Sequence, residues 1–437
     1  MPEGGPDLLF LCLASRKNVT AMKTLFLFPA MLLLAAACNP ETFSLNPTVC
    51  RNDVMGGSSG HSQGGDSAKV ISPSVRDTAV LVSGVEYPED YDWQRDTAFG
   101  QVSGKVVLFR NGERILEIPT GAEGKASLDP DMHHLVEGHL YAEYTDASHT
   151  YISRDGKSLY TFEGREYLRG ILTLDGKLYT LSQRRDGNGF VLRCDGKVLM
   201  DKDSGLILKS FGDYPDRQSG ALYENEGKVC FHYSKGSGDA RVWYSVQDLT
   251  ESQIYLDDGE LLDARFFGDD LCVVSILNGR GVQMTIGKRQ NVAQKAANPK
   301  MSGVSLLKNG QEVLAMGKIK YIMMNLRPSQ ACIWSFSGVR TSMDWEYNFV
   351  VDADKNIYMY GSTDGKGTYV VNSSGKRMAS ISGLVPYSRR IAAMCGERMY
   401  LALAPADGGG KAVIWSGGKT SELTLNGFLT GMDVRSK

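Results

Sequence analysis

Aromatic residues stand beside charged residues at several widely spaced points of the chain. This combination suits molecular recognition, because flat rings stack on sugar faces or apolar side chains while carboxylates and guanidinium groups hydrogen-bond hydroxyl and carboxylate groups. A shared binding rim fits the pattern, and so does a structural role in which each ring wedges between neighbouring elements and each charge is solvated. The candidate ligand-binding residues are Tyr91, Asp92, Trp93, Arg165, Tyr167, Asp213, Tyr214, Asp216, Arg217, Asp344, Trp345, Glu346, Tyr347, Tyr387, Arg389 and Arg390.

The carboxylates of this set also permit glycoside hydrolysis, which needs one carboxyl as acid and a second as base or nucleophile. Gly-x-Ser-x-Gly occurs at 56–60 and 60–64, but both matches lie in a Gly- and Ser-rich segment and not between a predicted strand and helix, so they do not indicate a nucleophile elbow. Because no complete catalytic set can be assembled from the sequence, binding is favoured over hydrolysis and the catalytic residues stay unassigned. The acid and base of a hydrolase would be two of Asp92, Asp213, Asp216, Asp344 and Glu346.

Two segments partly resemble the Asp-box of sialidases, Ser-x-Asp-x-Gly-x-Thr-Trp. The segment 362–369 has the Ser, the Asp and the Thr at matching places but lacks the central Gly. The segment 153–157 has its Gly one place early and no Trp. The motifs therefore do not support a sialidase.

The sequence gives little support for a metal site or a cofactor. His133 and His134 are adjacent, with Asp129 and Asp131 close by, but neighbouring side chains on a strand point to opposite faces, so both histidines rarely bind one ion. We predict no metal and no cofactor. The cysteines never form Cys-x-x-Cys, and four lie inside apolar strands, which favours buried free thiols. The six cysteines that follow Cys38 in the chain are Cys50, Cys194, Cys230, Cys272, Cys332 and Cys395.

Composition narrows the partner class. The net charge of the 437 residues is −2, which disfavours nucleic acid and anionic membrane surfaces as partners. The 49 glycines against 14 prolines are typical of a turn-dense β protein. The expected partner is a glycan, a peptide or an envelope protein, and we expect a monomer. A purely structural component of an envelope assembly is the remaining alternative.

A repeated hairpin signal indicates the elements that must position these residues. Asn111-Gly112, Asp155-Gly156, Asp195-Gly196 and Gly417-Gly418 each separate two apolar runs, and such pairs favour two-residue hairpin turns. With a degenerate copy near Val246, the turns recur about every 44 residues, a spacing typical of propeller blades.

Two further turn classes fall in fixed order within each period, so each repeat has four antiparallel strands. The sequence therefore predicts an all-β fold, a β-propeller of eight blades, with seven as the alternative. The third blade is expected to use 168–174, 178–183, 190–193 and 198–200. The first, near 77–121, is irregular, and 428–434 is expected to pair with it and close the ring, which removes an exposed sheet edge.

The order of strands also predicts where binding occurs. In a propeller, the turns between strands one and two and between strands three and four share one face. The blade-to-blade connections and the turns between strands two and three share the other, where ligands usually bind. The aromatic and charged clusters fall on this second face.

The N-terminal region reads as a targeting segment. Met22-Lys23 precedes an apolar run, 25–34, that closes in Ala35-Ala36-Ala37-Cys38. This order is typical of a secretory signal, and Met22 is a candidate start in place of Met1. The closing residues resemble the bacterial lipoprotein lipobox, which implies cleavage before Cys38 and lipid on its thiol. A plain signal peptide cut nearby is the alternative.

The predicted organisation is an upstream segment with signal peptide over 1–37, a lipid attachment site and flexible Gly- and Ser-rich tether over 38–76, and the propeller over 77–437. In its lipobox, tether and Asp-Gly-Lys hairpins the chain resembles the uncharacterised β-propeller lipoproteins of Bacteroidetes. The resemblance implies an outer-membrane, lipid-anchored envelope protein with membrane contact only through the anchor, and it implies no particular activity.

Overall fold

The computed structural model describes residues 78–91, 104–120, 133–185, 189–208, 220–237, 240–256, 259–277, 281–295, 299–321, 330–343, 347–386, 391–406 and 411–436. The expectations for the signal peptide, Cys38, Cys50 and the tether lie outside these residues. In the described ranges the chain forms β-strands joined by turns, with no α-helix. No helix in them has the length and apolar character to cross a bilayer.

The strands form eight antiparallel sheets, which we number as blades 1 to 8. Blades 1 to 4 contain β1 (Thr78–Glu86), β2 (Lys105–Arg110) and β3 (Glu113–Pro119); β4 (His133–Val136), β5 (His139–Thr145), β6 (His149–Arg154) and β7 (Lys157–Glu163); β8 (Glu166–Leu174), β9 (Lys177–Arg184), β10 (Phe190–Cys194) and β11 (Lys197–Lys202); and β12 (Leu206–Ile207), β13 (Tyr223–Asn225), β14 (Lys228–Lys235), β15 (Val242–Gln247) and β16 (Thr250–Ile254).

Blades 5 to 8 contain β17 (Glu260–Phe267), β18 (Asp270–Leu277), β19 (Gly281–Ile286) and β20 (Arg289–Lys295); β21 (Pro299–Asn309), β22 (Glu312–Tyr321), β23 (Gln330–Ser335) and β24 (Gly338–Met343); β25 (Asn348–Val351), β26 (Ile357–Gly361), β27 (Gly367–Asn372) and β28 (Arg377–Ser382); and β29 (Leu384–Pro386), β30 (Ala392–Cys395), β31 (Arg398–Pro405), β32 (Val413–Ser416) and β33 (Lys419–Glu422). The remaining strand, β34 (Gly427–Ser436), belongs to blade 1.

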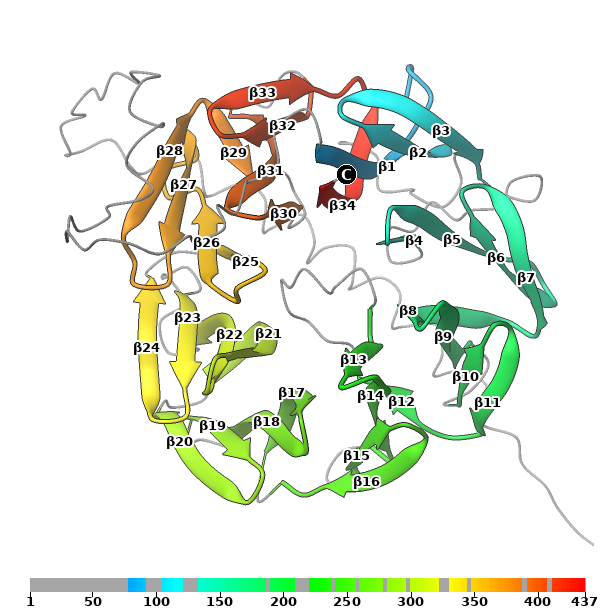
Figure 1. Ribbon diagram of the computed structural model, residues 1–437, viewed down its shortest axis with the longest axis vertical. Helices are drawn as coiled ribbons and strands as arrows, with labels where there is room; N and C mark the ends of the chain where they lie inside the picture. Colours follow the sequence, from blue (N-terminus) through cyan, green and yellow to red (C-terminus); the bar gives the residue numbers. More distant parts are fainter. Residues whose placement is uncertain are drawn as a thin grey trace, which may run out of the picture. The chain divides into compact units, whose positions relative to one another are not determined.

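The blades follow one another round a ring (Figure 1). The apolar core lies in the seams between them. Each of the eight seams has its own hydrophobic cluster, drawn from two consecutive blades. In the seam of blades 3 and 4, for example, Leu192 packs with Phe231. The chain is therefore the eight-bladed β-propeller that the turn spacing predicts, and the four strands of blade 3 lie where the sequence places them.

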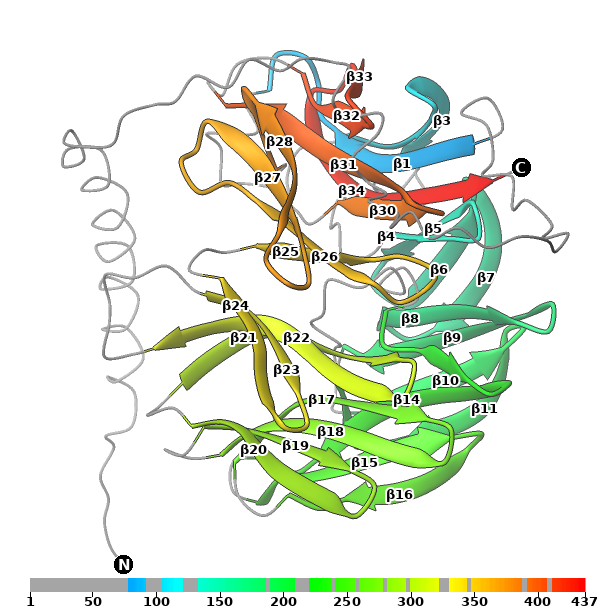
Figure 2. The same ribbon diagram turned by 60° about the vertical axis from the view of Figure 1, so that its left-hand side comes forward.

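The ring closes through strands from distant parts of the chain. β34 pairs antiparallel with β1 from Thr78↔Ser436 to Glu86↔Gly427, and the two lie side by side in both views (Figure 2). The segment 428–434 is therefore the innermost strand of blade 1, as expected. This pairing covers the edge of β1 that would otherwise face solvent.

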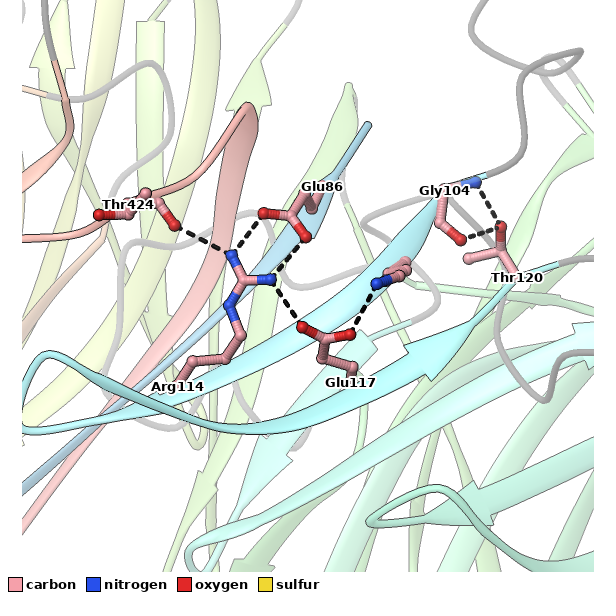
Figure 3. A network of polar contacts seen from close by, with 7 residues as sticks. Glu86, Gly104, Arg114, Glu117, Thr120 and Thr424 are labelled. Carbon is pink, nitrogen blue, oxygen red and sulfur yellow. Dashed lines mark hydrogen bonds and ion pairs between the residues drawn. The ribbon is translucent and has the colours of Figure 1, made fainter. Parts of the chain in front are cut away.

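An arginine fastens the closure (Figure 3). Arg114 on β3 donates through Nη1 to Glu86 Oε2 at 2.7 Å and through Nη2 to the Thr424 carbonyl at 3.0 Å. Glu86 ends β1, and Thr424 lies in the connection that leads into β34. Arg114 also pairs with Glu117 at 2.8 Å, and Lys105 holds the other oxygen of that carboxylate at 2.7 Å.

The Asp-Gly and Asn-Gly turns bond to the neighbouring hairpin of the same blade. The Asp155 amide donates to the Leu140 carbonyl, and Asp155 Oδ1 accepts from the Leu140 amide at 2.9 Å. Asp195 makes the same pair of bonds to Leu178. We call the side of the ring that carries these turns the hairpin face. The opposite side, which carries the blade-to-blade connections, is the connection face.

The innermost strand is split in blades 4 and 8. In blade 4, β12 and β13 both pair with β14, and in blade 8, β29 and β30 both pair with β31. The residues between the two halves, 209–219 and 387–390, lie outside the described ranges. They carry seven of the sixteen predicted ligand-binding residues.

The described cysteines are free thiols. Cys230, Cys272 and Cys332 are fully buried, which confirms the prediction for these three, and Cys194 and Cys395 are half-buried. Burial raises the pKa of Cys230 and Cys272 to about 12 and that of Cys332 to about 11. These three thiols therefore act as small apolar side chains.

Candidate functional site

The seam between blades 2 and 3 brings two predicted residues together on the connection face. Arg165 lies in the connection between β7 and β8, and Tyr167 is the second residue of β8. Across from them, Arg185 follows β9 and begins the turn to β10. Its amide donates to the Arg165 carbonyl at 2.8 Å, which fixes the turn against the connection.

Tyr167 lies against two guanidinium groups. The guanidinium carbon of Arg185 is 3.8 Å from the ring centroid, and that of Arg169, two residues further along β8, is 5.0 Å away. Both distances are within the range of cation–π attraction. Arg185 is held further by a bond of 3.3 Å from its Nε to the Glu166 carbonyl. The half-buried ring of Tyr167 therefore helps to hold the guanidinium groups of Arg169 and Arg185 in place.

A buried carboxylate lies beneath this pair. Glu143, on β5 of blade 2, is fully inaccessible to solvent. Its Oε2 accepts a hydrogen bond from the Leu168 amide of blade 3, beside a bulge in β8. Its Oε1 makes no hydrogen bond and lies 3.6 Å from Arg185 Nη2. Burial raises the pKa of Glu143 from 4.5 to about 7, although the Leu168 bond and the charges of Arg185 and Arg169 oppose the rise.

The other carboxylate of the seam is already paired. Glu166 accepts two hydrogen bonds from Arg193 on β10, at 2.7 and 2.8 Å, and both side chains are buried. The Arg193 guanidinium also lies 3.8 Å from the ring centroid of Phe162 in blade 2. The ion pair thus lies within blade 3, and the contact of Arg193 with Phe162 joins it to blade 2. Both oxygens of Glu166 are bonded to Arg193 and not to Arg169 or Arg185.

Blade 4 fixes the strand that carries Arg169. The Ala221 amide donates to the Arg169 carbonyl at 2.7 Å, and Gly220 forms a β-bridge with Gly170. Gly220 has φ of +69°, and a Cβ there would lie 2.2 Å from the Arg169 carbonyl oxygen. Only glycine allows this close approach.

The arrangement can hold an anion. Two guanidinium groups face one carboxylate that is partly protonated near neutral pH, so the cluster carries excess positive charge. Among the described residues no three His, Cys, Asp or Glu side chains gather closely enough for a metal ion. We call Glu143, Tyr167, Arg169 and Arg185 the seam cluster.

The other predicted residues lie apart from the seam cluster or outside the described ranges. Arg165 is exposed on the connection face. Tyr91 follows β1 and packs with Tyr87 at a centroid distance of 5.1 Å. It lies between β1 and β2 of blade 1, and not between two blades as the sequence predicts. Tyr347 is 4% exposed in the core of the seam between blades 6 and 7, as the wedge interpretation expects. Outside the described ranges lie Asp92, Trp93, Asp213, Tyr214, Asp216, Arg217, Asp344, Trp345, Glu346, Tyr387, Arg389 and Arg390.

Sequence reasoning missed three members of the cluster. Arg185 opens a charged turn between strands two and three, on the face where binding was expected, so its position was available as a signal. Arg169 lies two residues after Tyr167 on β8. Nothing in the sequence around Glu143 shows that its side chain reaches the neighbouring blade.

The segment compared with the Asp-box forms the turn between β26 and β27. Asp364 accepts from the Lys366 amide at 2.9 Å and from the Tyr369 hydroxyl at 3.1 Å. Thr368 is buried and donates to the Leu384 carbonyl at 2.8 Å. These bonds stabilise the turn locally.

Comparisons with known proteins give no family for this chain. No protein-family model matches the chain, and no curated protein matches it. Among solved structures it is similar to a Mycobacterium tuberculosis puromycin-hydrolysing peptidase, with 10% identity, a TM-score of 0.43 and coverage of 68% of this chain and 52% of that one. This chain thus spans about half the length of that peptidase.

Two further solved structures are similar. The β-propeller domain of the Trilobed protease from Pyrococcus furiosus has 10% identity and a TM-score of 0.37, over 68% of this chain and 94% of that one. The dihydro-haem d1 dehydrogenase NirN has 12% identity and a TM-score of 0.44, over 82% and 75%. These likenesses concern the fold alone, and the strand pairing shows that the chain is an eight-bladed β-propeller.

Proposed function

We propose that this propeller is a binding protein that recognises a glycan, a peptide or a protein partner on its connection face, at the seam of blades 2 and 3. One observation carries the proposal: Arg169 and Arg185, from two separate segments, both lie on the ring of Tyr167. Arg185 Nε donates to the Glu166 carbonyl, but neither guanidinium makes a hydrogen bond to a side chain within the described ranges, so the remaining donors are available to a ligand.

Binding is tested with a glycan and peptide array probed with the labelled full chain. We expect array ligands that the wild type binds to be lost on Arg185→Gln. Arg184→Gln is the matched control, because Arg184 is the adjacent residue at the end of β9 but is paired with Asp201 and Asp203. Failure of the wild type to bind any array ligand, or equal binding by both variants, would contradict the proposal.

Hydrolysis is a second candidate, favoured by Glu143. A carboxyl group with a pKa near 7 is protonated often enough at neutral pH to act as a general acid. Against this, Glu143 is fully buried and bonded to the Leu168 amide. A glycosidase substrate panel run beside the array separates the two functions, because turnover that is lost in Glu143→Gln would favour the hydrolase.

We further propose that the chain is a lipid-anchored protein of the bacterial cell envelope, held to the outer membrane through Cys38. The support is the apolar run 25–34 followed by Ala35-Ala36-Ala37-Cys38 and a Gly- and Ser-rich segment. Cys38→Ala should release the protein from the membrane fraction and prevent lipidation. Unchanged processing and membrane attachment of this variant would exclude the anchor.

A further inference from the structure

The ring of Tyr167 is unsuited to stacking on a sugar. Arg185 lies 3.8 Å from its centroid, so a guanidinium already covers one ring face, and Arg169 approaches the same ring at 5.0 Å. A guanidinium stacked on an aromatic ring keeps its N–H donors directed outward in its own plane. The chemistry that this site offers to a ligand is therefore that of two oriented cations.

The charge balance of the seam is incomplete. Arg193 takes both oxygens of Glu166, so that carboxylate does not neutralise the cluster. Among the described residues, Glu143 is the other carboxylate beside Arg185, and its Oε1 lies 3.6 Å from Arg185 Nη2 without a hydrogen bond. Within the described residues, Arg169 has no ion pair. Glu143 alone cannot neutralise two guanidinium groups, so the cluster favours a further anion.

We propose that the recognised ligand carries a carboxylate, which binds to the guanidinium groups of Arg169 and Arg185 and replaces Glu143 as the partner of Arg185. This inference rests on the proposed binding function. A carboxylate fits better than a phosphate because Arg185 already stands beside a carboxylate of this chain. A planar, singly charged group also matches the in-plane donors of a stacked guanidinium. Glu143 is a positioning residue in this scheme, since it acts on the ligand through Arg185.

The site then binds its ligand together with a proton. The charged and titratable groups that face Glu143 are Arg185 from the β9–β10 turn, Arg169 and Glu166 from β8, and His134, on the same side of the blade by its register in β4. A bound carboxylate adds negative charge beside Glu143 and favours its protonated form. Because the pKa of Glu143 is about 7, affinity should fall as pH rises from 6 to 8.

The test measures binding of matched probes to the full chain by calorimetry at pH 6 and pH 8. The carboxylate probes are trigalacturonate and a short peptide rich in Asp, and the neutral probes are the methyl ester of the saccharide and the Asn-substituted peptide. Glucose 6-phosphate represents the phosphate class. We expect at least one carboxylate probe to bind about tenfold or more tightly than its neutral match. It should also bind more tightly than the phosphate.

Variants assign the contacts. Arg185→Gln and Arg169→Gln should each weaken the carboxylate probe about tenfold or more, since each removes a charged hydrogen-bond partner. Arg184→Gln should leave affinity unchanged. Glu143→Gln keeps an oxygen to accept from the Leu168 amide but cannot ionise. It should bind as tightly at pH 8 as at pH 6, whereas the wild type weakens by about tenfold over that range.

Three outcomes would overturn the inference. They are equal affinity for charged and neutral probes, tighter binding of the phosphate through Arg185, and a pH dependence that persists in Glu143→Gln. Array ligands that bind through Arg185 while neither carboxylate probe binds would overturn the carboxylate assignment and leave the binding function standing. A wild-type chain that binds nothing on the array removes both.

Discussion

The guanidinium of Arg193 donates two hydrogen bonds to the carboxylate of Glu166, Nη1 to Oε2 at 2.7 Å and Nη2 to Oε1 at 2.8 Å, inside the seam of blades 2 and 3. A second carboxyl group, that of Glu143, lies in the same seam, where it accepts a hydrogen bond from the Leu168 amide and from no charged group. The two acids therefore differ in their hydrogen-bond partners within one interface.

Breaking the Glu166–Arg193 pair should be costly. Glu166→Gln leaves the Arg193 charge buried without its counter-ion, and such changes cost about 3 kcal/mol or more. The free energy of unfolding from urea titration measures this loss. Arg184→Gln, which breaks an exposed ion pair on the same blade, should cost less than about 1 kcal/mol. Similar losses in the two variants would show that burial does not strengthen the Glu166 pair.

Glu143 should make stability depend on pH. Its pKa is raised from 4.5 to about 7 on folding, so the folded state binds the proton more tightly. The stabilisation is therefore complete below pH 4.5 and is lost as pH rises through about 7. Its size is about 3 kcal/mol, from the energy equivalent of each pKa unit.

The measurement compares wild type with Glu143→Gln by urea unfolding at several pH values. The wild-type free energy of unfolding should fall relative to the variant's as pH rises from 4.5 to 7. A constant difference across this range would mean that Glu143 titrates with an ordinary pKa.

Leu249 occupies a turn position where blades 1, 2, 3 and 8 have a glycine of positive φ. Asp248 and Leu249 have φ of 47° and 66° in the turn between β15 and β16, which corresponds to Asp195-Gly196 in blade 3. The left-handed conformation costs a non-glycine residue about 1–2 kcal/mol. Leu249→Gly should therefore raise the free energy of unfolding by about 1 kcal/mol, after the entropy that glycine adds to the unfolded chain is subtracted.

The reciprocal change in blade 3 is the control for that variant. Gly176 has φ of +71°, and an added Cβ would meet no atom within 4 Å. Gly176→Ala should lower stability by about 1 kcal/mol through backbone conformation alone. Opposite signs for the two variants support the strain at Leu249, and a destabilising Leu249→Gly would refute it.

Gly220→Ala should displace the strand that carries Arg169. The new Cβ would lie 2.2 Å from the Arg169 carbonyl oxygen, so the backbone of β8 or of blade 4 must move. We expect a loss of about 1–3 kcal/mol in the free energy of unfolding. Gly227→Ala, also at positive φ but with no atom within 4 Å of the added Cβ, separates the clash from the backbone cost. Equal losses would show that contact with Arg169 is unimportant.

The fold was predictable because its signals are local. Asp155-Gly156 and Asp195-Gly196 specify hairpins by turn geometry, and their regular recurrence gives four strands per blade and eight blades. The second role of these aspartates, accepting from the amides of Leu140 and Leu178, depends on how two hairpins align within a blade, and composition does not show it.

The candidate site was predictable only in outline. Tyr167 and Arg165 stand out by type and by their place in a connection. The contact of Glu143 with the Leu168 amide depends on the register between two blades, set by packing of residues such as Tyr141 and Ile171. The burial of Tyr347 likewise depends on how blades 6 and 7 pack, and no local sequence pattern predicts that packing.

The pairing of β34 with β1 has a consequence for how the protein folds. Ser83 and Thr430, which contact each other across these strands, are 347 positions apart in the chain. Contacts between such distant residues form slowly. The edge of β1 therefore stays unpaired until the other seven blades have folded. During that interval β1 can accept a β34 strand from a second copy. Refolding at high protein concentration is therefore expected to yield strand-exchanged dimers beside closed rings, with a proportion set by concentration at the moment of closure.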